Sequence, residues 1–223
     1  MDELKFAVIG NPVSHSLSPD IHLFFASQFQ LERYTYNKIK SNENDFERDI
    51  NDFFKNGGVG LNVTVPFKGL AYNLCDELDQ SAGLCKSVNT VLIDSGKLIG
   101  HSTDGQGLID DFLHKEITLE DSKILIIGAG GSAASIISSL LSHGKIKEIS
   151  ILNRTKSNAL RLLDLFETNR LLMHEEGDEY DIVINTTPIS MNVDDIILPP
   201  ELIMNKPICY DLFYDKEKTL FQK

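Results

Sequence analysis

The sequence predicts an α/β protein with two domains, each built around a mainly parallel β-sheet. Apolar runs typical of buried strands alternate with helical patterns along most of the chain, and this order is typical of parallel strands joined by crossover helices. One apolar run, at residues 124–127, leads into a glycine-rich turn and a further helical pattern. The length of 223 residues is enough for one large or two modest domains. We expect domains of residues 1–104 and 105–223, with the boundary in the segment 102–120.

The first domain is expected to begin with three strands that alternate with two helices. This order implies parallel pairing through right-handed crossovers. Two later strands flank the sequence Asp94-Ser95-Gly96, which is typical of a hairpin turn. The expected strands are residues 5–10, 34–39, 59–65, 88–93 and 97–101. The expected helices are a segment starting near residue 18, residues 43–55 and residues 66–75.

The first helix has a recognisable start. Ser18 is expected as its N-cap, because Pro19 and Asp20 follow at positions where the first helical turn favours them. Its apolar side chains recur at the spacing of a helix face that packs on a core. They are Ile21, Phe24, Phe25 and Phe29.

The second domain is expected to continue the alternation of strands and helices. The expected strands are residues 124–127, 147–152, 180–184 and 207–211. The expected helices are residues 106–115, 135–142 and 156–166.

Residues 123–134, K-I-L-I-I-G-A-G-G-S-A-A, form the most informative single stretch. Gly128, Gly130 and Ala133 occupy the three small-residue positions of a dinucleotide-binding turn. The helix that follows would present free N–H groups and a partial positive charge to a phosphate. The flanking strand and helix are both readable, so we predict a Rossmann-type nucleotide site here.

The end of the next strand indicates which dinucleotide binds. NAD sites usually carry an acidic residue about 20 residues beyond the glycines, where it holds the ribose hydroxyls. This chain instead has Asn153 followed by Arg154. An arginine can pair with a 2′-phosphate and stack on adenine, so we favour NADP over NAD. The alternative is an ordinary exposed loop arginine.

Composition excludes several other classes of function. The net charge of -12 argues against general binding to nucleic acid or to an anionic membrane. No signal peptide or membrane-spanning run is apparent. The three cysteines and six histidines show no disulfide framework or metal-ligand spacing, so no metal is expected. A reducing cytoplasm fits best.

A series of short motifs covers nearly the whole chain and resembles the shikimate dehydrogenase family in order and spacing. In the first domain they are H-S-L-S-P at 15–19, N-V-T-V-P-F-K at 62–68, S-V-N-T at 87–90 and S-T-D-G at 102–105. In the second they are G-A-G-G-S-A at 128–133, N-R-T at 153–155, N-T-T-P at 185–188 and Y-D-L-F-Y at 210–214.

The resemblance implies an N-terminal substrate domain and an NADP-binding Rossmann-type domain. It implies reduction of 3-dehydroshikimate to shikimate with NADPH, on the route through chorismate to aromatic amino acids, with Lys68 and Asp104 as the catalytic pair. The substrate-binding residues it implies are Ser16, Ser18, Asn62, Thr64, Lys68, Asn89, Asp104 and Tyr214. The implied cofactor contacts are Gly128, Ala129, Gly130, Gly131, Ser132, Asn153, Arg154, Thr155, Lys156, Thr187 and Leu212.

The chemistry of these residues agrees with such a reaction. The first-domain motifs supply neutral hydroxyls and amides, which match a small ring with several hydroxyls. Lys68 and Asp104 are the charged members of the set. A lysine beside a carbonyl can stabilise the developing negative charge and donate the proton that accompanies hydride transfer, while an aspartate orients it.

The sequence departs from the family pattern in three places. Ser102 stands where the family usually has Asn, and Ser190 stands where it usually has Gly. The family also continues beyond the Y-D-L-F-Y motif into a helix that supplies substrate and nicotinamide contacts, whereas this chain stops at Lys223. We therefore expect an apparent C-terminal truncation.

Two alternatives remain for the function: a quinate/shikimate dehydrogenase that uses NAD or NADP, and a weakly active binding fragment. The oligomeric state also remains open between monomer and homodimer.

Overall fold

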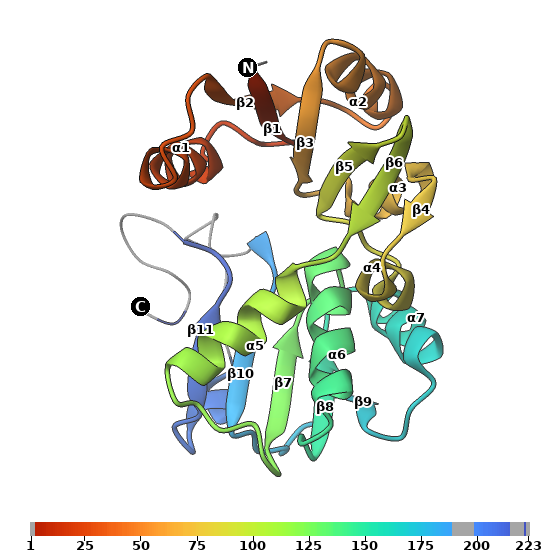
Figure 1. Ribbon diagram of the computed structural model, residues 1–223. Helices are drawn as coiled ribbons and strands as arrows, with labels where there is room; N and C mark the ends of the chain where they lie inside the picture. The colour runs from red at the N-terminus through yellow and green to blue at the C-terminus, as the bar shows by residue number, and fades with distance from the viewer. Residues whose placement is uncertain (1–2, 189–198, 215–220, 222–223) are drawn as a thin grey trace. The chain divides into compact units, whose positions relative to one another are not determined.

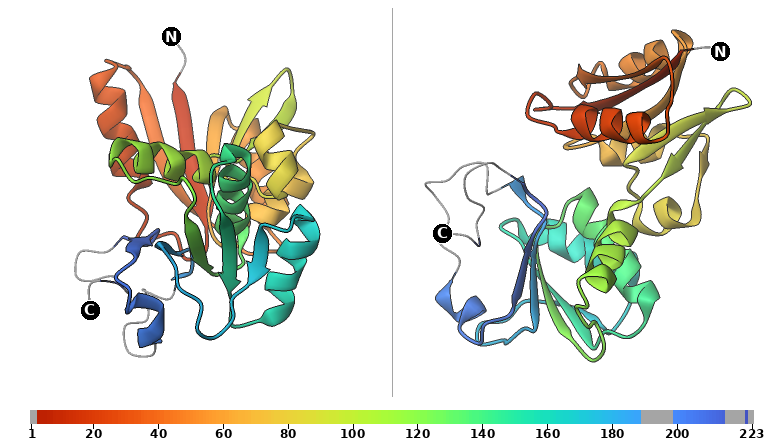
Figure 2. Two further views of the ribbon diagram at one scale, coloured as in Figure 1. Left: turned by 90° about the horizontal axis from the view of Figure 1, so that it is seen from below. Right: turned by 60° about the vertical axis from the view of Figure 1, so that its left-hand side comes forward.

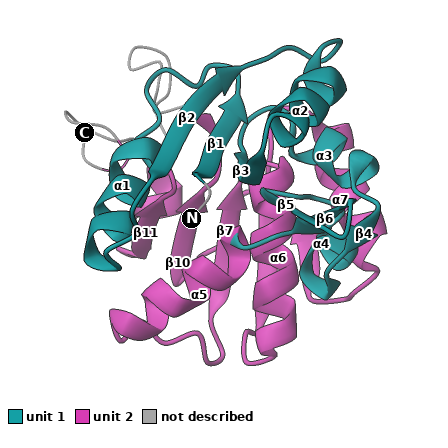
Figure 3. Ribbon diagram, turned by 45° about the horizontal axis from the view of Figure 1, so that its top comes forward, with its two compact units in different colours: residues 1–103 teal, residues 104–223 magenta. Residues whose placement is uncertain are grey.

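The computed structural model describes residues 3–188, 199–214 and 221 (Figure 1). It divides into two compact units, residues 1–103 and 104–223 (Figure 3). The expected Ser190 departure lies outside the described residues. None of the helices in the described part of the chain is long and apolar enough to cross a membrane.

The first unit is built on a six-stranded sheet with the order β2-β1-β3-β5-β6-β4. The strands β1, β2 and β3 pair in parallel, as expected, whereas β5 pairs antiparallel with both β3 and β6. The strands are β1 (Leu4–Gly10), β2 (Tyr34–Lys40), β3 (Gly58–Val63), β4 (Glu77–Leu78), β5 (Thr90–Asp94) and β6 (Lys97–His101). The helices are α1 (Ser18–Gln28), α2 (Phe46–Lys55), α3 (Lys68–Leu74) and α4 (Gln80–Cys85).

The core of the first unit forms where α2 covers the sheet. Phe46, Ile50 and Phe54 recur every four residues on α2, and all three are buried. This spacing places them on one helix face. They pack with Ile9 of β1 and Leu61 of β3. The helix predicted at residues 43–55 is thus confirmed from Phe46 to Lys55.

The helix α1 differs from its prediction in two respects. Ile21 donates its backbone N–H to the Leu17 carbonyl at 3.0 Å, so Leu17 is the N-cap and Ser18 is the first helical residue rather than the cap. The expected core face is also wrong. The four apolar side chains are 44–75% exposed: Ile21, Phe24, Phe25 and Phe29.

The reason for the second difference lies in which face of α1 contacts the sheet. His22 stacks on Tyr36 of β2 with ring centroids 4.5 Å apart, and Ala26, four residues further along, is buried. These two residues share one helix face. A narrow side chain at position 26 lets α1 approach β2, and the large apolar groups lie on other faces.

The second unit contains a five-stranded, fully parallel sheet with the order β11-β10-β7-β8-β9. The chain runs outward from β7 to β8 and β9, then returns to β10 on the other side of β7. The carboxyl ends of β7, β8 and β10 therefore meet at a topological switch point, where such sheets bind ligands. The strands are β7 (Lys123–Ile127), β8 (Glu148–Leu152), β9 (Leu171–Met173), β10 (Ile182–Asn185) and β11 (Ile208–Asp211). The helices are α5 (Asp104–His114), α6 (Gly131–His143), α7 (Lys156–Phe166) and the short 3-10 helix η2 (Pro200–Ile203).

Helices α5 and α6 lie side by side in every view (Figure 2). Gly105 is at their contact, where its backbone N–H donates to the Ser135 hydroxyl at 3.0 Å. A Cβ atom at Gly105 would lie 2.2 Å from the Ser135 carbonyl oxygen and 2.3 Å from the Ser139 hydroxyl oxygen. The close approach of these two helices therefore depends on the absence of a side chain at position 105.

Replacing Gly105 by alanine should lower the free energy of unfolding by about 1–3 kcal/mol, because the helices must separate to admit the methyl group. Gly107 on the same helix provides the matched control, since a Cβ there would meet nothing within 4 Å. Gly107→Ala should instead be neutral or stabilising by about 0.5–1 kcal/mol, as expected for alanine in a helix. Urea unfolding of the two variants measures this difference. Equal stability of the two would show that α5 and α6 are not closely packed.

Candidate active site and dinucleotide site

In the first unit, several predicted site residues follow the carboxyl ends of parallel strands. The loop after β1 carries Ser16 and leads into Ser18, and β3 is followed by Thr64 and then Lys68. The backbone ties these loops together, since Thr64 donates its N–H to the Ile9 carbonyl at 2.9 Å. Parallel β1 and β3 end at the same edge of the sheet, so the fold brings this group of residues to one edge.

Ser16 and Ser18 form a small hydroxyl pair at the start of α1. Ser16 is buried, and its Oγ lies 3.1 Å from the Ser18 Oγ. The Ser18 backbone N–H also donates to the Ser16 Oγ at 3.3 Å. The preceding loop is fastened to β2, because the Lys38 ammonium donates to the Ser14 carbonyl at 2.6 Å. The two hydroxyls are therefore held on an ordered loop.

Asn62 and Asn89 belong to one row of hydrogen-bonded side chains. The Tyr36 hydroxyl donates to the Asn62 Oδ1 at 2.6 Å, and the Asn62 Nδ2 donates to the Thr90 Oγ1 at 3.2 Å. The Thr90 hydroxyl in turn donates to the Asn89 Oδ1 at 3.2 Å. His22 stacks on Tyr36 at the outer end of this row, and burial lowers the pKa of its imidazole. The row orients both amides, which the sequence had indicated only as members of two separate motifs.

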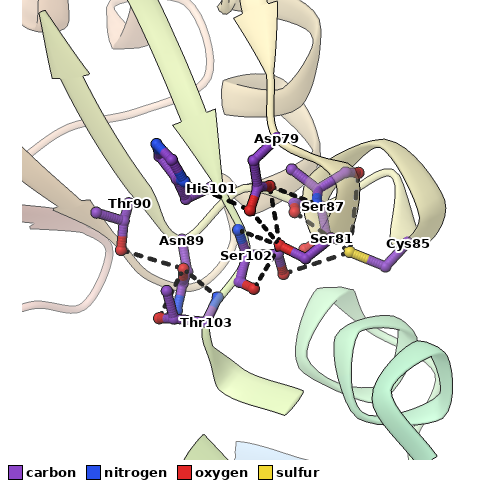
Figure 4. Close-up of polar contacts among 10 residues, drawn as sticks. Asp79, Ser81, Cys85, Ser87, Asn89, Thr90, His101, Ser102 and Thr103 are labelled. Carbon is purple, nitrogen blue, oxygen red and sulfur yellow. Dashed lines mark hydrogen bonds and ion pairs between the residues drawn. The ribbon is translucent and has the colours of Figure 1, made fainter. Parts of the chain in front are cut away.

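The row continues from Asn89 to the segment that precedes Asp104 (Figure 4). The Asn89 Nδ2 donates to the Thr103 Oγ1 at 2.9 Å, and the Thr103 backbone N–H donates to the Asn89 Oδ1 at 3.0 Å. Thr103 is the last residue of the first unit, and Asp104 is the first residue of α5 in the second unit. Asn89 therefore fixes the position from which Asp104 extends.

Lys68 is the first residue of α3, and its place is fixed by its neighbours. Phe67 is 1% exposed and packs on Phe46 of α2 with ring centroids 4.9 Å apart. The Lys68 carbonyl accepts the Val88 N–H at 3.0 Å, which joins α3 to the S-V-N-T segment. The half-buried Lys68 therefore stands on a packed support rather than on a loose surface helix.

In the second unit, the glycine-rich turn has the geometry that dinucleotide binding requires. Gly128 has a φ of +114°, and a Cβ there would lie 2.4 Å from the Thr186 Oγ1, so only glycine fits. Gly130 is the N-cap of α6, and a Cβ there would meet nothing within 4 Å. Ala133 lies in the first turn of α6 and is fully buried. The turn is thus open above Gly130, where a pyrophosphate would approach the helix N-terminus.

The charged residues beside this turn come from the loop after β8 and from α7. Arg154 and Lys156 are both exposed, and the Asn153 Nδ2 donates to the Thr155 carbonyl at 2.8 Å, which shapes their loop. Arg161 of α7 was not identified from the sequence. Its Nη2 donates to the Ala129 carbonyl of the glycine-rich turn at 3.4 Å. Its position in a helical pattern gave no signal that it would face this turn.

Thr187 and Leu212 follow the ends of β10 and β11, and a buried asparagine connects their loops. Asn185 is 0% exposed. Its Oδ1 accepts the Thr187 hydroxyl at 2.6 Å, and its Nδ2 donates to the Asp211 Oδ1 at 2.9 Å. The Leu212 N–H also donates to the Asn185 carbonyl at 3.0 Å. The sequence placed Asn185 in a motif but did not reveal this structural role.

Tyr214, the remaining predicted substrate residue, lies in the second unit. Its ring is parallel to that of Phe213, with an interplanar angle of 8° and centroids 6.4 Å apart, and it is 52% exposed.

Within the described part of the chain, no group of three or more histidine, cysteine or carboxylate side chains is arranged to hold a metal ion. Cys75, Cys85 and Cys209 do not form disulfide bonds with one another.

Comparison with known proteins gives two family matches, one in each half of the chain. Residues 8–91 match the model of the shikimate dehydrogenase substrate binding domain. Residues 112–197 match the model described as shikimate / quinate 5-dehydrogenase.

Individual relatives cover nearly all of the chain. The protein named shikimate dehydrogenase (NADP(+)) from Legionella pneumophila (strain Lens) is 43% identical over 216 residues, which span 96% of this chain and 80% of the relative. A crystal structure of shikimate 5-dehydrogenase from Thermus thermophilus in complex with shikimate has a TM-score of 0.85 and 29% identity, with 98% of this chain and 81% of that chain covered. A shikimate dehydrogenase structure in complex with NADP+ has a TM-score of 0.84 at 29% identity, and covers 99% of this chain and 80% of that one.

Proposed function

The chain belongs to the shikimate dehydrogenase family, and we propose that it reduces 3-dehydroshikimate to shikimate with NADPH, on the route through chorismate to aromatic amino acids. The observation that carries this proposal is the row of oriented amides and hydroxyls from Asn62 through Thr90 and Asn89 to Thr103, which leads to Asp104. Neutral groups of this kind suit a substrate ring with several hydroxyls.

The substrate is assigned to the first unit. Ser16 and Ser18 offer hydroxyls from the loop after β1, and Thr64 offers one from the loop after β3. Asn62 and Asn89 offer amides whose orientation is set by their neighbours. Tyr214 is assigned as an additional substrate contact from the second unit. Each of these hydroxyl and amide groups can donate or accept a hydrogen bond as the ring requires.

The glycine-rich turn fits a dinucleotide, since Gly128 has the necessary φ and the space above Gly130 is open. When bound, NADPH supplies the hydride. Residues 128–132 would hold the pyrophosphate at the N-terminus of α6, and residues 153–156 would hold the adenosine end. Thr187 and Leu212 would contact the cofactor from the loops after β10 and β11.

Lys68 and Asp104 are assigned the proton chemistry. As the carbonyl carbon gains a hydride, its oxygen gains negative charge, and the Lys68 ammonium stabilises this charge and donates the proton that completes the hydroxyl. Asp104 orients Lys68 and accepts a hydrogen bond from a neighbouring hydroxyl of the ring. The carbonyl thus takes up one hydride and one proton in total.

Arg154 should determine the preference for NADPH over NADH. Replacing Arg154 by alanine should weaken NADPH binding about tenfold to a hundredfold, because a charge-assisted contact to the 2′-phosphate contributes about 1.5–3 kcal/mol. NADH binding should change little. Fluorescence titration of both cofactors provides the measurement.

Lys145→Ala is the matched control for this experiment. It removes the same charge from an exposed residue just before β8, at the opposite end of that strand from Arg154, and should leave both dissociation constants unchanged. If Arg154→Ala weakened NADPH and NADH equally, Arg154 would not read the 2′-phosphate.

The proposed reaction is tested by following NADPH consumption with the purified chain. We expect consumption that depends on 3-dehydroshikimate, with weaker oxidation of quinate than of shikimate in the reverse direction. The family description that includes quinate makes quinate the relevant competitor. Preferential quinate oxidation with NAD would favour the quinate branch, and ligand binding without turnover would favour a binding fragment.

A further inference from the structure

A second polar network lies on the other side of the segment that precedes Asp104. It joins Asp79 and Ser81, at the start of α4, to His101 and Ser102, at the end of β6 (Figure 4). We call these four residues the α4–β6 network. The two segments are about twenty residues apart in the sequence. The sequence patterns predicted neither β4 nor α4.

Asp79 is the centre of this network. It is the N-cap of α4, and its Oδ1 accepts the Ala82 N–H at 2.8 Å. Its carboxylate also lies 2.8 Å from the Ser81 hydroxyl and 3.4 Å from the Nδ1 of His101. The backbone N–H of Asp79 donates to the Gly100 carbonyl at 3.0 Å. Asp79 therefore fastens the first turn of α4 to the last residues of β6.

Ser81 extends this connection to the backbone of Ser102. The Ser81 Oγ lies 2.8 Å from the Ser102 carbonyl oxygen and accepts the Ser102 N–H at 3.3 Å. A hydroxyl has one hydrogen, so Ser81 donates either to Asp79 or to the Ser102 carbonyl at a given moment. In both arrangements it remains an acceptor for the Ser102 N–H. Ser81 therefore always accepts the Ser102 N–H, and it also bonds the Ser102 carbonyl when its hydrogen is not given to Asp79.

The side chain of Ser102 is held as well. It is 6% exposed, and the Cys85 Sγ lies 3.3 Å from its Oγ. Asn89 holds the next residue, Thr103, through its backbone N–H and its hydroxyl. Beyond Asp104, the Gly105 N–H donates to the Ser135 hydroxyl within the second unit. Asp104 therefore lies between neighbours whose backbones are each fixed by a hydrogen bond.

We propose that Ser81 is a positioning residue for Asp104, because it fixes the backbone of Ser102 while Asn89 fixes that of Thr103. This inference rests on the proposed function, in which Asp104 orients Lys68 and binds a ring hydroxyl. Without the Ser81 hydroxyl, the Ser102 backbone loses this support, and the segment that carries Asp104 depends more heavily on Asn89. Ser81 touches neither substrate nor cofactor in this scheme.

Ser81→Ala should lower kcat about tenfold, because the free energy of one hydrogen bond would no longer help to position Asp104. The dissociation constant of NADPH should stay unchanged, since Ser81 belongs to the first unit. Ser81→Thr keeps the hydroxyl and should recover most of the activity. Ser95→Ala is the matched control, because Ser95 is an exposed serine in the turn at the far end of the β5–β6 hairpin, and it should leave kcat unchanged.

A second measurement separates positioning from a general loss of structure. Asp104→Asn alone should lower kcat, and adding Ser81→Ala to it should cause no further loss, because Ser81 acts through Asp104. An additional tenfold loss in the double variant would overturn the proposal, as would unchanged kcat in Ser81→Ala alone. If Asp104→Asn alone left kcat unchanged, the proposed role of Asp104 in the reaction would be wrong. If Asp104→Asn lowered kcat clearly but Ser81→Ala did not change it, only the proposed role of Ser81 would be wrong.

Discussion

Replacing Lys68 by alanine should lower the turnover of 3-dehydroshikimate by about 10²- to 10⁴-fold, the range typical of removing a general acid. The ammonium group is needed most when the carbonyl oxygen becomes anionic, so kcat should fall far more than shikimate binding weakens. Phe67 and α3 should keep their packing, because the Lys68 backbone, and not its side chain, accepts the Val88 N–H. Steady-state kinetics and a shikimate titration give the two numbers to compare.

Lys55 provides the control for this experiment, because it is an exposed lysine at the end of α2 in the same unit. Lys55→Ala removes one positive charge and should leave kcat unchanged. Turnover of Lys68→Ala at the wild-type rate would identify Lys68 as an ordinary helix lysine, and the proposed proton chemistry would be wrong.

Replacing Asp104 by asparagine should lower turnover by about 100-fold. Asparagine preserves the shape of the side chain but removes the charge that orients Lys68, and misplacement of a reacting group by about 1 Å can cost this much in rate. Because Asp104 also binds a ring hydroxyl in this scheme, the KM for 3-dehydroshikimate should rise. Kinetics at saturating NADPH measure both effects.

Asp110→Asn makes the same chemical change on the same helix. Asp110 is exposed and accepts a hydrogen bond from Gln106 at 2.7 Å, so this variant should have normal kinetics. If Asp104→Asn and Asp110→Asn had the same small effect, the carboxylate of Asp104 would have no part in the reaction.

Local patterns in the sequence predicted those parts of the fold that depend on local interactions. The strand–turn–helix around Gly128 could be predicted, because a positive φ and the close approach of Thr186 restrict that position to glycine. The helix expected at residues 43–55 forms α2, and its buried residues Phe46, Ile50 and Phe54 follow the helical repeat. The same reasoning failed for α1, where His22 and Ala26 face β2 instead of the larger apolar residues. Periodicity identifies an apolar face but not the neighbour that will cover it.

The candidate site shows the same limit more clearly. Sequence motifs identified Asn62, Asn89 and Asp104 as candidate site residues. The hydrogen bonds around them join residues far apart in the chain, such as Asn62 with Thr90. Arg161 and Ser81 gave no signal, because each acts on a backbone group of a distant segment. Such contacts depend on strand order and register, which a single sequence does not encode in any local pattern.

In the proposed function, this chain transfers a hydride from NADPH to 3-dehydroshikimate. The most direct test uses NADPH that carries deuterium at both positions of the nicotinamide C4, with the product analysed by mass spectrometry. We expect shikimate that is heavier by one deuterium, located on the carbon that was the ketone. Binding of both ligands without any deuterated shikimate would show that the chain does not carry out this hydride transfer.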